Sequence, residues 1–309
     1  MSTVHHLYDL LIFGGRHDPS ITALINAAEE RNISLLKVLH DEDTEPEINW
    51  DYQSGSFIIN GQICNVNSSF LRYDVFSKPA KTPSQLDRGF GWYTTIMGAC
   101  LVSNTIYTPN KFMDHRTGHK SFNLACAKGF GIPIPDTHIT NSQTVFSHFC
   151  EDKNRVIKPV AGGSYCISAD TAIESTEWHD GKAPMPAFVQ ECLSYPEYRI
   201  FRYGDHFMTF EIDSDHLDYR AFKENSMFRV PNEKIGEDTL KKLKDMTDRL
   251  GVDFFACDFK TRQSTGEVVF LEMNTGPMFV GYDICVDGEL INGMLDWLTS
   301  QTATKSNVA

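Results

Sequence analysis

One segment in the C-terminal third constrains the fold most, because it predicts a β-hairpin with three oxygen-bearing side chains. Residues 252–260 and 267–273 are rich in Val and Phe, and the polar residues between them supply turn chemistry. Asp258 lies on the first predicted strand, whereas Glu272 and Asn274 lie two residues apart on the second. Side chains two apart leave the same face of a strand, so a hairpin register could bring Asp258 opposite them.

Two carboxylates and one amide oxygen form a hard but incomplete set of metal ligands. Mg²⁺ takes its remaining ligands from water and substrate phosphates, so this set suits a metal-nucleotide complex better than a closed structural site. The alternative is an ordinary hairpin whose acidic side chains face water. We favour the metal site because the acids interrupt apolar strands, FFACDF and VVFLEMN, where an isolated charge is costly to bury.

The composition is that of a globular protein and excludes some classes of partner. The chain has 309 residues, enough for two or three sub-domains, of which 41% are hydrophobic and 22% charged. Its formal net charge of −13 argues against a general binder of nucleic acid or anionic membranes, since both require a positive surface. Local basic sites remain compatible with this charge.

The cysteines and the apolar segments predict a cytoplasmic protein. The eight cysteines show no CxxC pair and no zinc-ligand spacing, so we interpret them as dispersed, reduced thiols. The first residues lack the basic flank of a signal peptide, and no segment approaches the length of a membrane span. We therefore expect neither a signal peptide nor a transmembrane helix.

The first hundred residues predict a small parallel-sheet domain. Residues 7–13 and 33–39 are typical of buried strands, and Asp18-Pro19 between them offers an N-cap and a first-turn proline for a helix. The strand ends at Gly14-Gly15, which lacks the GxGxxG or GK[ST] pattern, so a plain turn is favoured over a phosphate loop. Asn60-Gly61 predicts a hairpin between residues 56–59 and 62–66.

Residues 91–103 have the apolar spacing of a buried helix, and Thr108-Pro109-Asn110 marks a domain boundary. Beyond it, residues 155–160 predict a strand that carries Lys158. Gly162, Gly163 and Ser164 follow, and a glycine pair behind a strand lysine can wrap backbone N–H groups round phosphate oxygens. A simple β-turn explains these glycines equally well.

The order of these motifs resembles the ATP-grasp superfamily, and within it the graspetide (microviridin-type) peptide-modifying ligases and the ribosomal-protein glutamate ligases. The resemblance covers most of the chain. No single motif is specific to the superfamily, but the ordered set of motifs is. This set comprises a helix-opening lysine, a strand lysine, a glycine turn, VQECL, EYR, DYR, CDF and FLEMN. It implies an α/β ATP-grasp fold with an N-terminal parallel-sheet (pre-ATP-grasp) domain, residues 1–108, and two α+β lobes that clasp the nucleotide, residues 109–190 and 191–309.

The resemblance also implies roles for individual residues. The nucleotide phosphates would be bound by Lys120, Lys158 and the turn of Gly162, Gly163 and Ser164. The adenine would meet the side chains of Gln190 and Glu191 and the backbone of Cys192 and Leu193. Glu197 would lie near the ribose or its hinge, and Arg199 on the transferred phosphate. Mg²⁺ would be held by Asp258, Glu272 and Asn274, and the element Asp218-Tyr219-Arg220 would engage a peptide substrate.

Three positions differ from the pattern of these ligases. The metal strand continues NTGPMF where relatives usually have asparagine-proline followed by glycine and an aromatic residue. The basic residue that is common after the hinge is absent from SYPEYR, and FLRYDVF only loosely matches the arginine-aromatic element of their first domain. These differences concern the substrate more than the nucleotide.

The expected enzyme is an ATP-dependent carboxylate-amine or carboxylate-hydroxyl ligase that uses ATP and Mg²⁺. ATP would convert a carboxylate to an acyl phosphate, and an amine or hydroxyl would displace the phosphate, with Arg199 and Arg220 stabilising the acyl phosphate and binding the acidic substrate. The expected substrate is an acidic peptide or amino acid, and a homodimer is left open. The alternatives are a free amino-acid or dipeptide ligase, a small-molecule kinase on the same fold, and a non-catalytic nucleotide-binding scaffold.

Overall fold

The computed structural model describes most of the chain: residues 6–41, 45–76, 83–151, 154–161, 165–214, 217 and 226–301, with the side chains of residues 83–87 excepted. Its contacts divide the chain into two compact units. The first unit combines Met1–Lys111 with Gly276–Ala309, and the second is Phe112–Thr275. Residues from 276 onward therefore belong with the N-terminal part, a pairing that the sequence did not predict. The division at residues 108 and 190 stays a prediction.

The first unit is built on a three-stranded parallel sheet, as the sequence predicted. The strand order is β2 (Leu35–His40), β1 (Tyr8–Gly15), β6 (Val66–Leu71). Helix α1 (Pro19–Glu30) connects β1 to β2, and it begins where predicted because the Asp18 carboxylate accepts a hydrogen bond from the Ser20 backbone N–H at 2.8 Å. Gly15 ends β1. A Cβ at this position would lie 2.1 Å from the Asp74 carboxyl carbon, so the close approach of Asp74 requires a glycine here.

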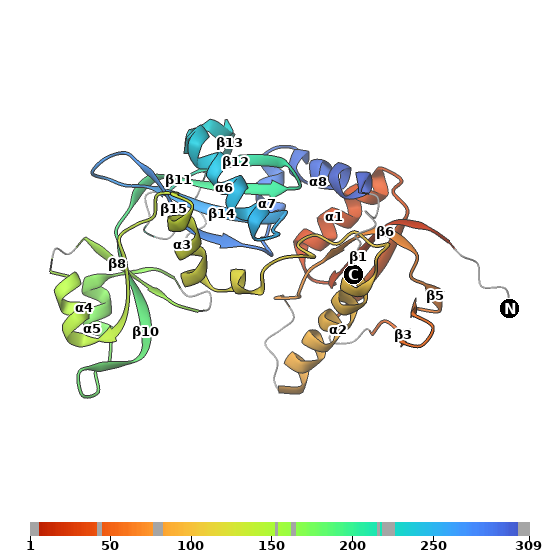
Figure 1. Ribbon diagram of the computed structural model, residues 1–309, viewed down its shortest axis with the longest axis horizontal. Coiled ribbons are helices and arrows are strands. Elements are labelled where there is room, and N and C mark those ends of the chain that lie inside the picture. The colour runs from red at the N-terminus through yellow and green to blue at the C-terminus, as the bar shows by residue number, and fades with distance from the viewer. Residues whose placement is uncertain are drawn as a thin grey trace. The chain divides into compact units, whose positions relative to one another are not determined.

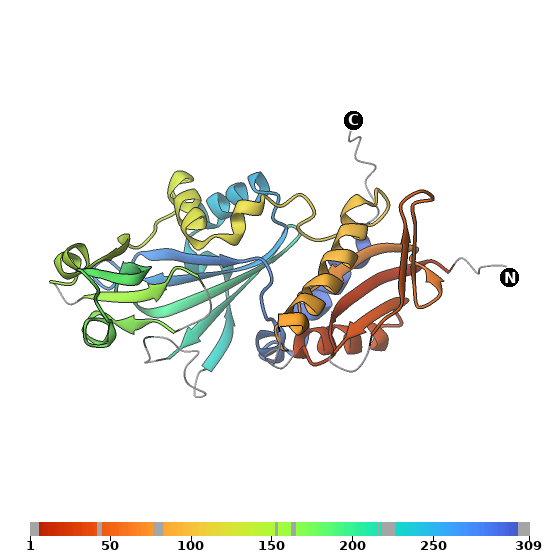
Figure 2. The same ribbon diagram turned by 90° about the horizontal axis from the view of Figure 1, so that it is seen from below.

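Helices cover both faces of this sheet (Figures 1 and 2). Leu11 and Phe13 of β1 pack in one buried cluster with side chains of α2 (Pro83–Val102), which begins earlier than the predicted helix. Helix α8 (Glu289–Ser300) contacts β1, β6 and α1, and its buried apolar side chains are Leu290, Ile291, Met294, Leu295, Trp297 and Leu298. The C-terminal helix thus completes the core of the N-terminal sheet.

A second, small antiparallel sheet contains the predicted hairpin at Asn60-Gly61. Its strands are β3 (Ile48–Asp51), β4 (Ser56–Ile59) and β5 (Gln62–Ile63). Asn60 and Gly61 have φ angles of 49° and 73°, the left-handed conformation that this turn requires. The second predicted strand, 62–66, is wrong in extent: β5 ends at Ile63, because Val66 leaves the hairpin to pair with Tyr8 of β1.

The second unit contains two antiparallel sheets. The four-stranded sheet has the order β7 (Thr137–Ser142), β10 (Lys182–Glu191), β8 (Arg155–Pro159), β9 (Ile167–Ser168). The five-stranded sheet has the order β13 (Ser226–Val230), β12 (His206–Asp213), β11 (Ser194–Tyr203), β14 (Phe254–Thr261), β15 (Val268–Asn274). The predicted hairpin of the C-terminal third is therefore present as β14 and β15.

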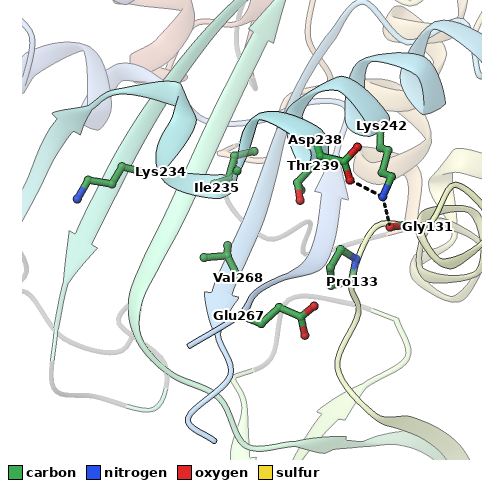
Figure 3. Close-up of a pocket in the computed structure, with 10 residues that line it drawn as sticks. Gly131, Pro133, Lys234, Ile235, Asp238, Thr239, Lys242, Glu267 and Val268 are labelled. Atoms are coloured by element: carbon green, nitrogen blue, oxygen red, sulfur yellow. Dashed lines mark hydrogen bonds and ion pairs between the residues drawn. The ribbon is translucent and has the colours of Figure 1, made fainter. Parts of the chain in front are cut away.

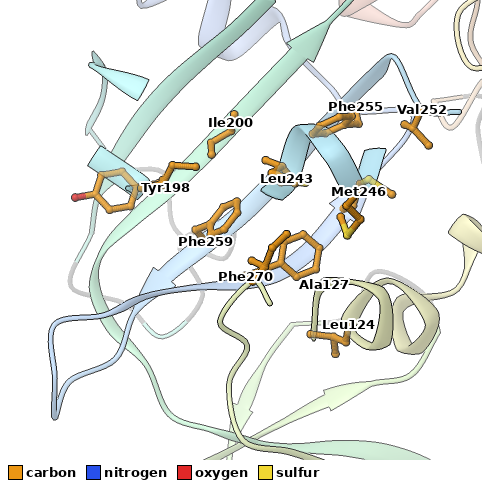
Figure 4. Close-up of a cluster of buried hydrophobic side chains, with 14 of the residues drawn as sticks. Leu124, Ala127, Tyr198, Ile200, Leu243, Met246, Val252, Phe255, Phe259 and Phe270 are labelled. Carbon is orange, nitrogen blue, oxygen red and sulfur yellow. The ribbon is translucent and has the colours of Figure 1, made fainter. Parts of the chain in front are cut away.

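Helices pack on one face of each of these sheets. Helices α4 (Gln143–Phe149) and α5 (Ala169–Ser175) share a buried cluster with Ile157 of β8 and Val189 of β10. Helices α3 (Lys120–Gly129) and α6 (Glu237–Arg249) share a larger cluster with the five-stranded sheet, in which Phe259 and Phe270 lie beside Leu243 and Met246 (Figure 4). The opposite face of the five-stranded sheet is the one that carries the charged residues described below.

The remaining described helices are short: the 3₁₀ turns His115–Gly118 and Asn232–Ile235, and α7 (Val280–Ile284). Within the described residues, no helix has the length and apolar character needed to span a bilayer.

Arg72 joins three distant parts of the first unit. Its Nε lies 2.5 Å from Oδ2 of Asp18, and both side chains are almost fully buried. Its Nη1 donates to the carbonyl oxygens of Gly276 at 2.8 Å and Pro277 at 2.6 Å. One guanidinium thereby connects the start of α1, the residue after β6 and the chain that returns from the second unit.

We predict that Arg72→Met lowers the free energy of unfolding by about 3–5 kcal/mol, because it leaves the Asp18 carboxylate buried without its cation. Urea denaturation followed by circular dichroism measures this change. Arg31→Gln is the matched control, since the Arg31–Asp296 ion pair is more exposed and should contribute about 1 kcal/mol or less. Equal unfolding midpoints for Arg72→Met and the wild type would contradict the prediction.

Candidate functional site

A row of charged side chains crosses three strands of the five-stranded sheet. Arg199 of β11 is directly opposite Asp258 of β14, and Asp258 is directly opposite Glu272 of β15. Directly paired residues project from the same face of a sheet, so the three side chains are neighbours. The structure therefore confirms the predicted register of Asp258 and Glu272. Asn274 pairs with Ala256, one step further along the same strands.

A β-bulge in β15 makes this arrangement possible. Asp258 pairs with Glu272, but the next residue, Phe259, pairs with Phe270, so Leu271 is an extra residue on β15. In a regular strand Phe270 and Glu272 would face the same side. The bulge shifts the alternation by one residue, which leaves Phe270 in the apolar cluster and turns Glu272 to the side of Asp258.

Basic side chains neutralise both carboxylates. Nη1 of Arg199 donates to the two carboxylate oxygens of Asp258 at 2.7 and 3.0 Å, and both side chains are largely buried. Lys120 is the first residue of α3, and its Nζ lies 3.0 Å from Oε2 of Glu272. The structure therefore brings together Lys120, Arg199, Asp258 and Glu272, all of which were predicted site residues.

The donor chemistry of this group fits a partly coordinated Mg²⁺. Among the described residues, no group of three or more His, Cys, Asp or Glu side chains could hold a metal ion by itself. Asp258, Glu272 and Asn274 supply two carboxylates and one amide, so a metal ion here needs further oxygens from another molecule. This is the ligand set expected of a site that binds a metal together with phosphates.

A second ion pair, between Glu197 and Lys260, lies on the same face. Only Glu197 was predicted from the sequence. Lys260 pairs in register with Glu197, and its Nζ lies 3.2 Å from Oε2 of Glu197. Nζ also donates to the Leu217 carbonyl at 3.3 Å and lies 4.6 Å from the centre of the Tyr195 ring. Strand alternation could have found Lys260, because it lies two residues after Asp258 and therefore on the same face.

Burial and charge pairing act differently on the two members of this second pair. Burial raises the pKa of Glu197, while Lys260 and the more distant Lys158 act to lower it and Asp258 acts to raise it. Burial alone would lower the pKa of Lys260, but Glu197 and Tyr195 together raise it. Lys158, on β8 of the other sheet, is thus within electrostatic reach of Glu197.

The predicted adenine-binding residues lie at the junction of β10 and β11. Gln190 is buried, and its Nε2 donates to Oγ1 of Thr137 on the neighbouring strand at 3.0 Å. The Glu191 carboxylate accepts hydrogen bonds from Nε of Arg262 at 2.9 and 3.2 Å. Cys192 and Leu193 are half-buried between the two strands, and the Cys192 N–H donates to the Asn154 carbonyl at 3.0 Å.

Five predicted site residues lie outside the part of the chain that the structure describes: Gly162, Gly163, Ser164, Asp218 and Arg220. Their predicted roles in phosphate and substrate binding stay predictions.

A pocket of about 540 Å³ is separate from the charged row (Figure 3). It is lined by residues before β7, around the start of α6 and at the start of β15, among them Gly131, Pro133, Ile235, Lys242 and Val268. Ile235 is a buried member of the apolar cluster under α3 and α6 and Val268 packs against that cluster, so this pocket lies on the helix-covered side of the sheet. None of the predicted site residues lines it.

Comparison with known proteins identifies the fold. No protein-family model matches the sequence, and no curated protein matches it. Among solved structures, the ATP-grasp ligase PsnB, complexed with a phosphomimetic variant of minimal precursor, Mg and ADP, is similar with a TM-score of 0.74 and 18% identity, covering 95% of this chain and 98% of that chain. The macrocyclase MdnC from Microcystis aeruginosa MRC, bound with precursor peptide MdnA, has a TM-score of 0.71 and 18% identity, covering 94% and 99%.

A third similar structure is the VanG D-Ala:D-Ser ligase from Enterococcus faecalis, with a TM-score of 0.57 and 18% identity, covering 94% of this chain and 97% of that chain. Each likeness extends over nearly the whole of both chains. The sequence identities are low, so the likeness concerns architecture. The predicted fold class is confirmed: this chain has the fold of the ATP-grasp ligases.

Proposed function

We propose that this protein is an ATP-dependent ligase that joins a carboxylate to an amine or a hydroxyl, with a peptide as its substrate. The observation that supports this most is the row of Arg199, Asp258 and Glu272 on the face of the five-stranded sheet opposite α3 and α6, with Lys120 ion-paired to Glu272 at its end. Such a row offers metal ligands and cations for phosphates in one place, which phosphoryl transfer requires.

The nucleotide would lie between the two sheets of the second unit. Lys120 and Lys158 would bind its phosphates, together with the turn of residues 162–164. Glu197 would accept hydrogen bonds from the ribose, and the backbone of Cys192 and Leu193 would meet the edge of the adenine. Because the Glu191 carboxylate is held by Arg262, Glu191 would contribute mainly through its backbone.

Asp258, Glu272 and Asn274 would hold Mg²⁺, which when bound neutralises phosphate charge. Arg199, fixed by its two hydrogen bonds to Asp258, would face the phosphoryl group that is transferred. A substrate carboxylate oxygen would attack the γ-phosphorus of ATP, forming an acyl phosphate as ADP leaves. An amine or hydroxyl would then attack the acyl carbon and lose its proton, and inorganic phosphate would leave.

The peptide as substrate class is supported by two observations of different kinds. PsnB and MdnC, which share the fold over nearly their whole length, are seen with precursors. In this chain, Asp218 and Arg220 match the element that the resemblance associates with peptide binding. A free amino acid or dipeptide remains the alternative substrate, since the D-Ala:D-Ser ligase has the same fold.

The metal-ligand proposal predicts that Glu272→Gln and Asn274→Ala each lower ATP turnover by about a hundredfold or more, the size typical of losing a preorganised electrostatic partner. Turnover is measured as ADP release, and Mn²⁺ binding in the presence of ADP is measured by electron paramagnetic resonance. Glu174→Gln, an exposed acid on α5, is the control and should change neither quantity. Normal turnover and normal Mn²⁺ binding in both purified variants would rule out this metal site.

The acyl-phosphate mechanism predicts that hydroxylamine, added to the enzyme with MgATP and its acidic substrate, gives a hydroxamate. Mass spectrometry of the substrate detects the product, and omission of ATP is the control. A phosphorylated substrate that is stable to hydroxylamine would instead identify the protein as a kinase on the same fold.

The pair of Glu197 and Lys260 predicts a pH effect on nucleotide binding. Lys260 lowers the pKa of Glu197, so its removal in Lys260→Met raises that pKa further above the usual value for a glutamate. In the variant Glu197 therefore gains a proton at a higher pH than in the wild type, and once protonated it no longer accepts two hydrogen bonds from the ribose. We expect the MgADP affinity of the variant to begin to fall at a higher pH than that of the wild type, as measured by calorimetry.

Coincident pH profiles for Lys260→Met and the wild type would show that Glu197 does not bind the nucleotide through its charge. Glu197→Gln is the companion variant, because it cannot ionise. Its MgADP affinity should be independent of pH over the range in which Glu197 titrates in Lys260→Met.

A further inference from the structure

Arg262 connects three segments at the junction of the two sheets of the second unit. It follows the last residue of β14, and its Nε donates to the Glu191 carboxylate at the end of β10. Its Nη2 donates to the Ile134 carbonyl at 2.9 Å, and its Nη1 forms a close ion pair with Glu267 across the β14–β15 turn. The guanidinium thus uses all three of its nitrogen atoms, each toward a different segment.

Glu191 connects this network to Cys192 and Leu193, the link between β10 and β11. Its backbone N–H donates to the Asp136 carbonyl at 2.9 Å, and its carboxylate accepts from the Asp136 N–H at 3.2 Å. Asp136 is itself held by Nη1 of Arg155 at 2.7 Å. Both the backbone and the side chain of Glu191 are therefore fixed immediately before Cys192 and Leu193.

The network lies at the edge of the apolar core. The Arg262 and Glu191 side chains are 22% and 19% exposed, and Ile134 packs against the apolar cluster under α3 and α6 without being one of its buried members. The network also fixes geometry, because a planar guanidinium imposes the directions of its hydrogen bonds.

We infer that Arg262 is a positioning residue of the nucleotide site: it holds Glu191 so that the backbone of residues 191–193 is preorganised for the adenine edge. The inference rests on the proposed nucleotide binding and adds a residue that neither the motifs nor the metal chemistry indicates. Preorganisation of a binding edge raises affinity because less conformational freedom is lost when the ligand binds.

The test compares two nucleotides that share the sugar, phosphates and metal but differ in the edge of the base. MgADP and MgGDP are titrated against Arg262→Gln, Glu191→Gln, the double variant and the wild type, with displacement of a fluorescent ADP analogue as the readout. We expect MgADP binding to weaken about tenfold in Arg262→Gln, the size of one charge-assisted hydrogen bond, and the ratio of ADP to GDP affinity to fall by the same factor.

Three comparisons make the test specific. The double variant should bind MgADP no more weakly than either single variant, since both substitutions remove the same interaction. Arg262→Lys should recover part of the affinity, because a lysine can pair with Glu191 but cannot also reach Ile134 in a fork geometry. Arg31→Gln, which removes a more exposed ion pair at the end of α1, should bind both nucleotides as the wild type does.

The outcomes separate this inference from the proposed function. If the wild-type protein binds no MgADP, the proposed function is wrong. If the wild type binds MgADP and Arg262→Gln binds it equally well, the inference is overturned and the function stands. Equal weakening of MgADP and MgGDP, or additive effects in the double variant, would also overturn it, because Arg262 would then act on the whole cleft or independently of Glu191.

Discussion

The bulge at Leu271 is the constraint on which the charged face depends. Phe270 belongs to the apolar cluster under α3 and α6, whereas Glu272, two residues later, pairs with Asp258 on the other side of the sheet. A regular strand would either expose the phenylalanine to water or bury the carboxylate among apolar side chains, and each is unfavourable. One extra residue resolves the conflict, so the core and the site can both be built from the same seven-residue strand.

Charge pairing is what allows the opposite face to carry so many ionisable groups. Arg199 pairs with Asp258, Lys120 of α3 pairs with Glu272, and Lys260 pairs with Glu197. A partly buried carboxylate without a cation would be strongly destabilised, and a cation without a carboxylate likewise. The same cations that stabilise this face are the groups a polyphosphate would need, so the requirements of folding and of nucleotide binding coincide at these residues.

The sequence predicts the parts of this structure that follow local periodicity. Alternating apolar residues and a polar turn located β14 and β15, and strand geometry placed Asp258 opposite Glu272. The bulge could not be predicted, because Phe270, Glu272 and Asn274 have the spacing of a regular strand. The pairs of Lys120 with Glu272 and Arg262 with Glu191 join residues far apart in the chain, and no local pattern encodes them. Alternation of side chains along β14 places Lys260 on the same face as Asp258, so this residue could also have been predicted.

The first unit is assembled from two segments that flank the second unit in the sequence, and this order affects synthesis. Strands β1, β2 and β6 precede the second unit, whereas α8, which covers β1 and β6, follows it. While the second unit is being translated, one face of the sheet therefore lacks the buried side chains of that helix. The nascent chain exposes apolar strand surface during this interval, in which such surface is open to aggregation and to chaperones.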